Sequence, residues 1–212
     1  MKKVIVEFIG TFFLVFTVGV TVVNPDAGVI APLAIGSVLM VMVYAGGHIS
    51  GGHYNPAVTF AVAIRGRMPA SEVPGYWLAQ IVAALAAAGA SYYLKGPNAA
   101  AGAPPPAYYL PQMVFAEFVF TFALAYVVLN VATAKANAGN SFYGLAIGFT
   151  VMVGAFAVGP ISGGAFNPAV ATGCYSLGLI PSVGQYLAYI ASELCAGALA
   201  AFVFKVLNPE DK

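Results

Sequence analysis

The chain has 212 residues, of which 61% are hydrophobic and only 7% are charged. Because about a quarter of the residues in a soluble domain are charged, this composition excludes an ordinary soluble protein and indicates one whose solvent is lipid. The net charge is only +1 and the basic residues are scattered along the chain, so nothing supports nucleic-acid binding.

Six apolar runs are long enough to cross a bilayer as helices, each crossing needing about 20 residues. Their approximate limits are 4–23, 31–47, 72–94, 112–132, 141–158 and 182–205. The first run follows two lysines and resembles a secretory leader, but Glu7 interrupts it and no convincing cleavage site follows. We therefore expect an uncleaved first span.

Two shorter apolar pieces, at 55–64 and 167–177, lie between the second and third runs and between the fifth and sixth. At about 1.5 Å per residue, ten residues form roughly 15 Å of helix, which is half of the ~30 Å hydrocarbon core. Each piece is therefore predicted to be a half-helix that ends near the membrane midplane.

The tripeptide Asn-Pro-Ala begins both short pieces, at Asn55, Pro56 and Ala57 and again at Asn167, Pro168 and Ala169. Ser-Gly-Gly precedes each copy at the same spacing, and the two copies are offset by 167 − 55 = 112 residues. Glu7 and Glu117, each inside an apolar run, are separated by a similar 117 − 7 = 110 residues. The chain is thus predicted to be two copies of one unit, with the functional site where they meet.

Three spans in each copy make the second copy enter the membrane from the opposite side. The predicted fold is an all-α membrane protein with six transmembrane helices and two re-entrant half-helices in two inverted repeats. It forms one domain over residues 1–212, with repeat one at about 1–95, a proline-rich external loop at about 95–111 and repeat two at about 112–212.

The basic residues predict the orientation. Lys95 falls on one side of this topology, and the other seven fall on the opposite side: Lys2, Lys3, Arg65, Arg67, Lys135, Lys205 and Lys212. Because cytoplasmic loops carry an excess of basic residues, we expect a multi-pass protein of the cell membrane with both termini in the cytoplasm.

The residue types of Asn-Pro-Ala suit the start of a helix that abuts another. Asparagine is a preferred N-cap, proline fits the first helical position, and alanine leaves room for the opposing half-helix. With the side-chain oxygen used as a cap, the amide N–H₂ groups of Asn55 and Asn167 are predicted to point into the gap. The positive ends of both helix dipoles would meet there and repel cations while admitting neutral molecules.

The segments that lead into both motifs are predicted to be non-helical backbone at membrane depth, which is tolerated only where it lines a cavity or is buried in protein. Their carbonyl groups would form a ladder of acceptors along one wall of a pore. The residues concerned are Gly51, Gly52, His53 and Tyr54 in repeat one and Gly163, Gly164, Ala165 and Phe166 in repeat two. Nothing in the sequence combines a nucleophile, base or metal cluster as an enzyme would.

The stretch from Gly47 to Thr59, its second copy and the inverted halves resemble the aquaporin (major intrinsic protein) family over nearly the whole chain. The resemblance implies a passive channel for water and small uncharged solutes, with no cofactor and with one pore in each subunit of a homotetramer. It also implies an outer constriction, which falls here at Ile35, Ala155, Gly164 and Val170.

Val170 stands where the family usually has an arginine, and the aromatic residue and histidine of strict water channels are absent as well. Losing these donors and the fixed charge predicts a wider, more apolar opening. This pattern resembles the broad-specificity members that pass water with glycerol, urea, ammonia or metalloid hydroxides.

Three glutamates lie inside predicted spans, where an ionisable group is a functional candidate. Glu7 and Glu117 are placed symmetrically and are expected to accept hydrogen bonds from the re-entrant loop of their own half, with ion or proton transfer as the alternative. Glu193 lies where the family usually has a proline, in a region that roughly matches Gln80, and a packing or interfacial role is expected for it.

The two histidines and the two cysteines of the chain are candidates for a metal site or a disulfide. His48 and His53 lack a third ligand at metal spacing, so they are expected to brace the loop or line the pore mouth. Cys174 and Cys195 lie among small apolar residues and are expected to be buried thiols without a disulfide.

Two other functions stay open on the sequence alone. A proton-coupled secondary transporter of a small neutral solute also uses inverted repeats and broken helices, with Glu7 or Glu193 as the coupling group. A strict water channel would require a narrower outer constriction than Val170 suggests.

Overall fold

The structure, a computed structural model, describes residues 1–23, 27–96 and 108–211. Within these ranges, six helices are long and apolar enough to cross a membrane: α1 (Lys2–Val22), α2 (Ala31–Ser50), α4 (Val73–Lys95), α5 (Leu110–Val128), α6 (Tyr143–Ser162) and α8 (Val183–Leu207). Shorter helical turns lie at Gly28–Ile30, Ala70–Glu72 and Lys135–Asn137, and a π-helical turn at Leu129–Thr133 continues α5. The predicted external loop at about 95–111 lies largely outside the described residues.

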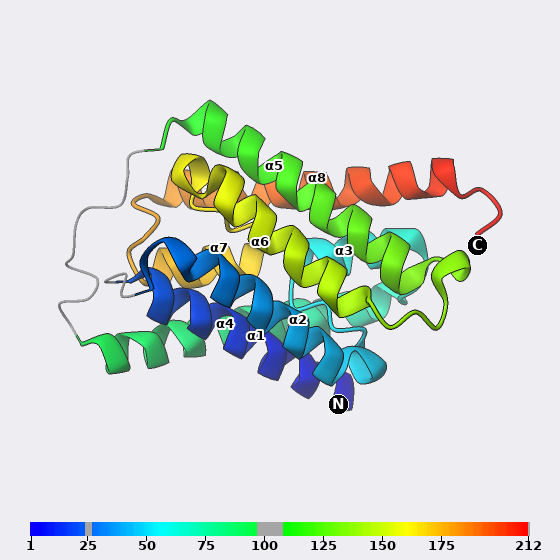
Figure 1. Ribbon diagram of the computed structural model, residues 1–212, viewed down its shortest axis with the longest axis horizontal. Helices are drawn as coiled ribbons and strands as arrows, with labels where there is room; N and C mark the ends of the chain where they lie inside the picture. The colour runs from blue at the N-terminus through cyan, green and yellow to red at the C-terminus, as the bar shows by residue number, and fades with distance from the viewer. Residues whose placement is uncertain (24–26, 97–107, 212) are drawn as a thin grey trace.

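The two predicted half-helices are present as α3 (Pro56–Arg65) and α7 (Pro168–Ser176), with 10 and 9 residues. Neither is long enough to cross a bilayer. In Figure 1, α3 lies toward the end of the bundle that carries both chain termini, and α7 lies toward the other end. The all-α class with six spanning helices and short re-entrant helices is confirmed.

The packing of the long helices has the same pattern in both halves of the chain. α1 packs against α2 and α4, and α5 packs correspondingly against α6 and α8. The halves meet where α2 packs against α6, where α3 packs against α8 and where α7 packs against α4. Each half-helix therefore lies on the last long helix of the opposite half, which brings the two Asn-Pro-Ala motifs to the centre.

The α2–α6 contact depends on glycine. A Cβ atom at Gly36 would lie 2.7 Å from the carbonyl oxygen of Gly148, and one at Gly148 would lie 2.7 Å from Cβ of Met40. Both distances are shorter than van der Waals contact, so only glycine allows the two backbones to come this close. Small residues play this part in membranes, where lipid is as apolar as the side chains and helix association depends on packing.

The outer surface of the bundle is apolar, as contact with lipid requires. Large hydrophobic side chains such as Phe115, Phe202 and Leu78 are 69%, 63% and 66% exposed. Cys174 and Cys195 are free thiols, and Cys195 lies exposed on α8. Cys174 is only half-buried. The expectation that both would be buried is therefore wrong for Cys195 and met only in part by Cys174, because an apolar sequence has the same composition on its lipid-facing side as on its packed side.

Both chain termini lie at the same end of the bundle (Figure 1), and ion pairs tie segments close to each terminus to other parts of the chain. Lys3 forms an ion pair with Glu72 at 2.9 Å. Arg65 and Arg67 pair with Asp211 at 2.6 and 3.1 Å, so the end of α3 is tied to the last described residue of the chain.

Candidate functional site

Both half-helices begin at an asparagine cap. The Oδ1 atom of Asn55 accepts a hydrogen bond from the N–H of Ala57 at 2.8 Å, and Oδ1 of Asn167 accepts one from the N–H of Ala169 at 2.9 Å. Proline follows each asparagine at the first helical position, where its missing N–H is not needed. The predicted caps are therefore present.

The amide nitrogens of the two asparagines form a crossed pair of hydrogen bonds. Nδ2 of Asn55 donates to the carbonyl oxygen of Phe166 at 2.9 Å, and Nδ2 of Asn167 donates to that of Tyr54, also at 2.9 Å. Each motif thus holds the loop of the opposite half. A side-chain amide has two N–H donors, and these bonds use one donor of each asparagine.

The carbonyl groups that accept these bonds come from strained backbone. Tyr54 and Phe166 are the non-glycine residues with positive φ in the described ranges, at 49° and 51°. Such a conformation costs of the order of 1–3 kcal/mol and persists only where surrounding contacts fix it. It turns each carbonyl toward the asparagine of the opposite half, so the strain has a direct structural purpose.

Glu7 fixes the first loop. Its carboxylate is fully buried and accepts four hydrogen bonds: from Oγ of Ser50 at 2.7 Å, from the N–H groups of His53 and Tyr54 at 3.0 and 2.7 Å, and from Nε2 of Gln80 at 2.8 Å. Two of the donors belong to the loop itself. The carboxylate therefore holds the backbone that presents the Tyr54 carbonyl.

Glu117 occupies the same place in the second half. Its buried carboxylate accepts hydrogen bonds from Oγ of Ser162 at 2.6 Å and from the N–H groups of Ala165 and Phe166 at 3.1 and 2.7 Å. These three donors correspond to Ser50, His53 and Tyr54 in the first half. The fourth donor to Glu7, the amide of Gln80, has no direct counterpart in the second half. A carboxyl group occupies the corresponding place beside Glu117.

That carboxyl group belongs to Glu193, whose part in the site the sequence reasoning missed. Glu193 is fully buried, and its Oε1 accepts a hydrogen bond from the backbone N–H of Asn167 at 2.9 Å. Beyond the expected packing or interfacial role, Glu193 therefore binds the backbone of the second Asn-Pro-Ala motif directly. Glu193 and Gln80 are separated by 193 − 80 = 113 residues, one more than the offset between the two motifs. This spacing could have predicted that Glu193 takes the place in the second half that Gln80 has in the first.

The ladder of carbonyl acceptors stays a prediction. The carbonyls of Tyr54 and Phe166 each accept one hydrogen bond from an asparagine amide and keep a second lone pair. The carbonyl oxygens of Ser50 and Ser162, which precede the ladder, accept hydrogen bonds from the hydroxyl groups of Tyr76 and Tyr189, respectively. No donor from the described part of the chain reaches the carbonyls between them, which belong to Gly51, Gly52, His53, Gly163, Gly164 and Ala165.

Two of the four predicted constriction residues lie side by side. A Cβ atom at Gly164 would lie 3.4 Å from Cα of Ala155, and the φ of +68° at this glycine is unfavourable for any side chain. Val170 is 5% exposed in the first turn of α7, and Ile35 is half-buried on α2. The joint role of these four residues as a constriction stays a prediction.

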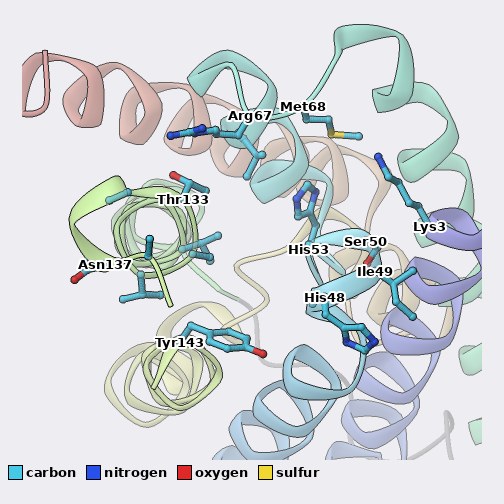
Figure 2. Close-up of a pocket in the computed structure, with 18 of the residues that line it drawn as sticks. Lys3, His48, Ile49, Ser50, His53, Arg67, Met68, Thr133, Asn137 and Tyr143 are labelled. Atoms are coloured by element: carbon cyan, nitrogen blue, oxygen red, sulfur yellow. The ribbon is translucent and has the colours of Figure 1, made fainter. Parts of the chain in front are cut away.

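A cavity of about 900 Å³ opens at the end of the bundle that carries the termini. Figure 2 shows Lys3, Arg67, Asn137 and Tyr143 around it, with His53 among the side chains that line it. Glu72, which also lines the cavity, is paired with Lys3. His53 is 8% exposed and its Nδ1 lies 3.2 Å from Oγ1 of Thr59, so this histidine braces the loop two residues before the first motif.

Comparison with known proteins gives the same assignment for the whole chain. The family model described as Major intrinsic protein matches residues 1–204. Aquaporin NIP1-3 of Oryza sativa subsp. japonica is 38% identical over 230 residues, an alignment that covers 100% of this chain and 75% of the relative. Nodulin-26 of Glycine max is 35% identical over 225 residues, with 100% and 80% covered.

A solved structure has the same fold. The aquaglyceroporin from Plasmodium falciparum matches with a TM-score of 0.84 over 98% of this chain and 97% of that chain, at 20% sequence identity. Six spanning helices with two half-helices that meet at paired asparagines define a multi-pass membrane channel and not an enzyme. The chain belongs to the major intrinsic protein family. It is a channel for water and small neutral solutes, and a proton-coupled transporter is not favoured.

Proposed function

We propose that the junction of the two half-helices is the midplane of a wide pore that passes water together with small neutral solutes such as glycerol, urea, ammonia or metalloid hydroxides. The crossed hydrogen bonds of Asn55 and Asn167 carry this proposal. They hold the amide groups of both asparagines at the junction, each with a second N–H donor. A solute oxygen that accepts from these donors replaces the hydrogen bonds it had in water.

The path of a solute follows from the groups that are left without a protein partner. From the 900 Å³ cavity it would pass the carbonyls of Gly51, Gly52 and His53, then the asparagine junction with Pro56, Ala57, Pro168 and Ala169, then the carbonyls of Gly163, Gly164 and Ala165. The carbonyls of Tyr54 and Phe166 hold the junction together. Glu7 and Glu117 support both loops from outside the path.

Exclusion of cations is assigned to the half-helix ends. Each helix N-terminus carries a partial charge of about +0.5, and α3 and α7 direct both ends at the junction. Val170 contributes no charge at the outer constriction, and neither do Ile35, Ala155 or Gly164. Selection there would rest on size and polarity, which favours small uncharged molecules with an apolar surface as well as water.

Orientation and assembly complete the proposal. The end with both termini is proposed to face the cytoplasm, which the bias of basic residues toward the cytoplasmic side supports. The cell membrane is the proposed location. Each subunit is proposed to consist of two inverted repeats, at about 1–95 and 112–212. Resemblance to the family implies a homotetramer with one pore per subunit, which cross-linking in native membranes would test.

A hyperosmotic glycerol jump on proteoliposomes tests the solute range. Light scattering should show faster shrinkage and faster re-swelling than in empty vesicles, because both water and glycerol permeate. Val170→Arg is the matched variant, and it should slow re-swelling more than shrinkage because the guanidinium fills the constriction and adds a charge. Faster shrinkage without faster re-swelling would instead indicate a strict water channel.

A further inference from the structure

Glu193 and Glu117 form a pair of carboxyl groups in the middle of the bundle. Glu193 comes from α8 and Glu117 from α5, and both are 0% exposed. Their oxygens accept hydrogen bonds from consecutive backbone N–H groups, those of Ala165 and Phe166 for Glu117 and that of Asn167 for Glu193, so the two carboxyl groups are neighbours. A carboxylate accepts hydrogen bonds and donates none. Two carboxylates held this close in the protein interior would repel each other.

Among the described helices that pack around the pair, none supplies a cation to compensate it. Helices α5, α6 and α7 contain no lysine, arginine or histidine. The single lysine of α8, Lys205, donates to the carbonyl of Ile64 at 3.1 Å, and the single arginine of α3, Arg65, pairs with Asp211 at the terminal end. One proton must therefore stay on the pair, because two buried like charges in contact are strongly disfavoured.

The remaining titratable groups that face the pair are neutral. They are Tyr189 on α8, Tyr108 before α5 and Cys174 on α7. The hydroxyl of Tyr189 is already donated to the carbonyl of Ser162. None of these groups supplies a positive charge, so the proton is the means by which the pair is neutralised.

The hydrogen bonds show which carboxyl group carries the proton. Both oxygens of Glu117 accept bonds, from Ser162, Ala165 and Phe166, so Glu117 acts as a carboxylate. Oε1 of Glu193 accepts from Asn167, whereas its Oε2 is buried and has no partner among the described residues. A proton on Oε2 makes this atom a donor to Glu117 and leaves every other hydrogen bond unchanged.

The first half of the chain contains the same arrangement with an amide. Nε2 of Gln80 donates to Oε2 of Glu7 at 2.8 Å and supplies the fourth hydrogen bond of that carboxylate. A neutral Glu193 has nearly the shape of glutamine and, like it, combines an acceptor oxygen with a donor, although it has one O–H where Gln80 uses two N–H groups, for Glu7 and Thr59. It would give Glu117 the fourth donor that Gln80 gives Glu7.

We infer that Glu193 is a positioning residue of the second pore motif and acts as a neutral carboxylic acid, whose Oε1 holds the Asn167 backbone while its proton holds Glu117. It touches no solute and transfers no proton during permeation. In alkaline medium the proton would leave, the two carboxylates would repel, and the second loop would lose the position on which flux depends. The flux consequence rests on the proposed channel function, whereas the protonation state does not.

Infrared spectroscopy tests the protonation state without reference to transport. The wild-type protein should show the carbonyl stretch of a buried protonated carboxylic acid, sensitive to exchange into D₂O, and Glu193→Gln should lack it. Glu210→Gln, which removes an exposed carboxylate near the C-terminal end, is the control and should retain the band. Absence of the band from the wild-type protein would overturn the inference even if the protein proved to be an active channel.

Flux measurements test the positioning role. Glu193→Gln should keep the wild-type water flux within about twofold at neutral pH, whereas Glu193→Leu, which leaves the Asn167 N–H unpaired, should lower it about tenfold. From mildly acidic to alkaline medium, the wild-type flux should fall reversibly and the flux of Glu193→Gln should not. An equal alkaline loss in both proteins, or loss of neutral-pH flux in Glu193→Gln, would overturn the inference.

Discussion

Replacing Gly197 by alanine should press α8 against the first pore motif. A Cβ atom at this position would lie 2.6 Å from the carbonyl oxygen of Ala57 and 3.2 Å from its carbonyl carbon, whereas ordinary contact begins at 3.4 Å. The helix or the motif must therefore move by roughly 3.4 − 2.6 = 0.8 Å. The neighbouring atoms are backbone and cannot rotate away, so we expect a loss of about 1–3 kcal/mol in the free energy of unfolding, the usual range for overpacking.

Unfolding in detergent can be followed through Trp77, the single tryptophan of the chain. Its indole N–H donates to the carbonyl of Pro56 at 3.0 Å, so its fluorescence reports on the motif next to Ala57. For a chain of this length, about 1 kcal/mol corresponds to about 2–4 °C in midpoint. Gly197→Ala should therefore unfold several degrees below the wild-type protein and should also conduct water more slowly.

Gly89→Ala is the matched control for Gly197→Ala. It makes the same chemical change in a long helix, but a Cβ atom at Gly89 would meet nothing within 4 Å. Its unfolding midpoint should stay unchanged or rise slightly, because alanine is favoured over glycine inside a helix by about 0.5–1 kcal/mol. Equal midpoints for Gly197→Ala and the wild-type protein would refute the close approach of α8 to the motif.

Three further substitutions have defined outcomes. Asn167→Asp removes the donor to the opposite loop and should lower water flux at least about tenfold with assembly retained on size-exclusion chromatography. Val170→Arg should reduce glycerol flux more than water flux in the osmotic jump; a wild-type proton leak that this substitution abolished would contradict cation exclusion by the helix ends. The backbone N–H of Lys135 and then the Arg65 guanidinium lower the pKa of Asp211 below its ordinary 3.8. The ionised carboxylate of Asp211 therefore stabilises the C-terminal contact fully above pH 3.8, and this stabilisation is lost as the pH falls through the lowered pKa. Asp211→Asn removes the charge, so it should raise the rate of amide hydrogen exchange near the C-terminus at neutral pH.

The limits of the half-helices could be predicted to within a residue or two. The predicted pieces at 55–64 and 167–177 correspond to α3 (Pro56–Arg65) and α7 (Pro168–Ser176). This accuracy is physical, because an asparagine cap followed by proline defines a helix start through bonds within three residues. Local chemistry of this kind is visible in the sequence without knowledge of the fold.

The ends of α2 and α6 were predicted too early, at 47 and 158, whereas the helices continue to Ser50 and Ser162. Glycine, histidine and proline in these stretches suggested breaks. In a membrane, backbone groups have to find partners within the protein, so each helix continues until Gly51 or Gly163 ends it in the left-handed conformation, at φ 92° and 86°.

The hydrogen-bond partners inside the site could not be predicted from spacing. That the amide of Asn55 would bind the carbonyl of Phe166, 111 residues away, depends on how closely the half-helices approach and on the strained backbone of Phe166. The same holds for Glu193, whose contact with Asn167 arises because α8 packs against α7. The repeat offset pointed to the position, but only the packing showed which atoms meet.

The two crossed motifs are proposed to form a passive pore for neutral molecules. The most direct test is to measure water flux and proton flux together in proteoliposomes that contain a trapped pH-sensitive dye, with an osmotic gradient and no ion gradient. We expect water permeability well above that of empty vesicles, with proton permeability no higher than theirs. Water permeability equal to that of empty vesicles, or solute movement that requires a proton gradient, would contradict it.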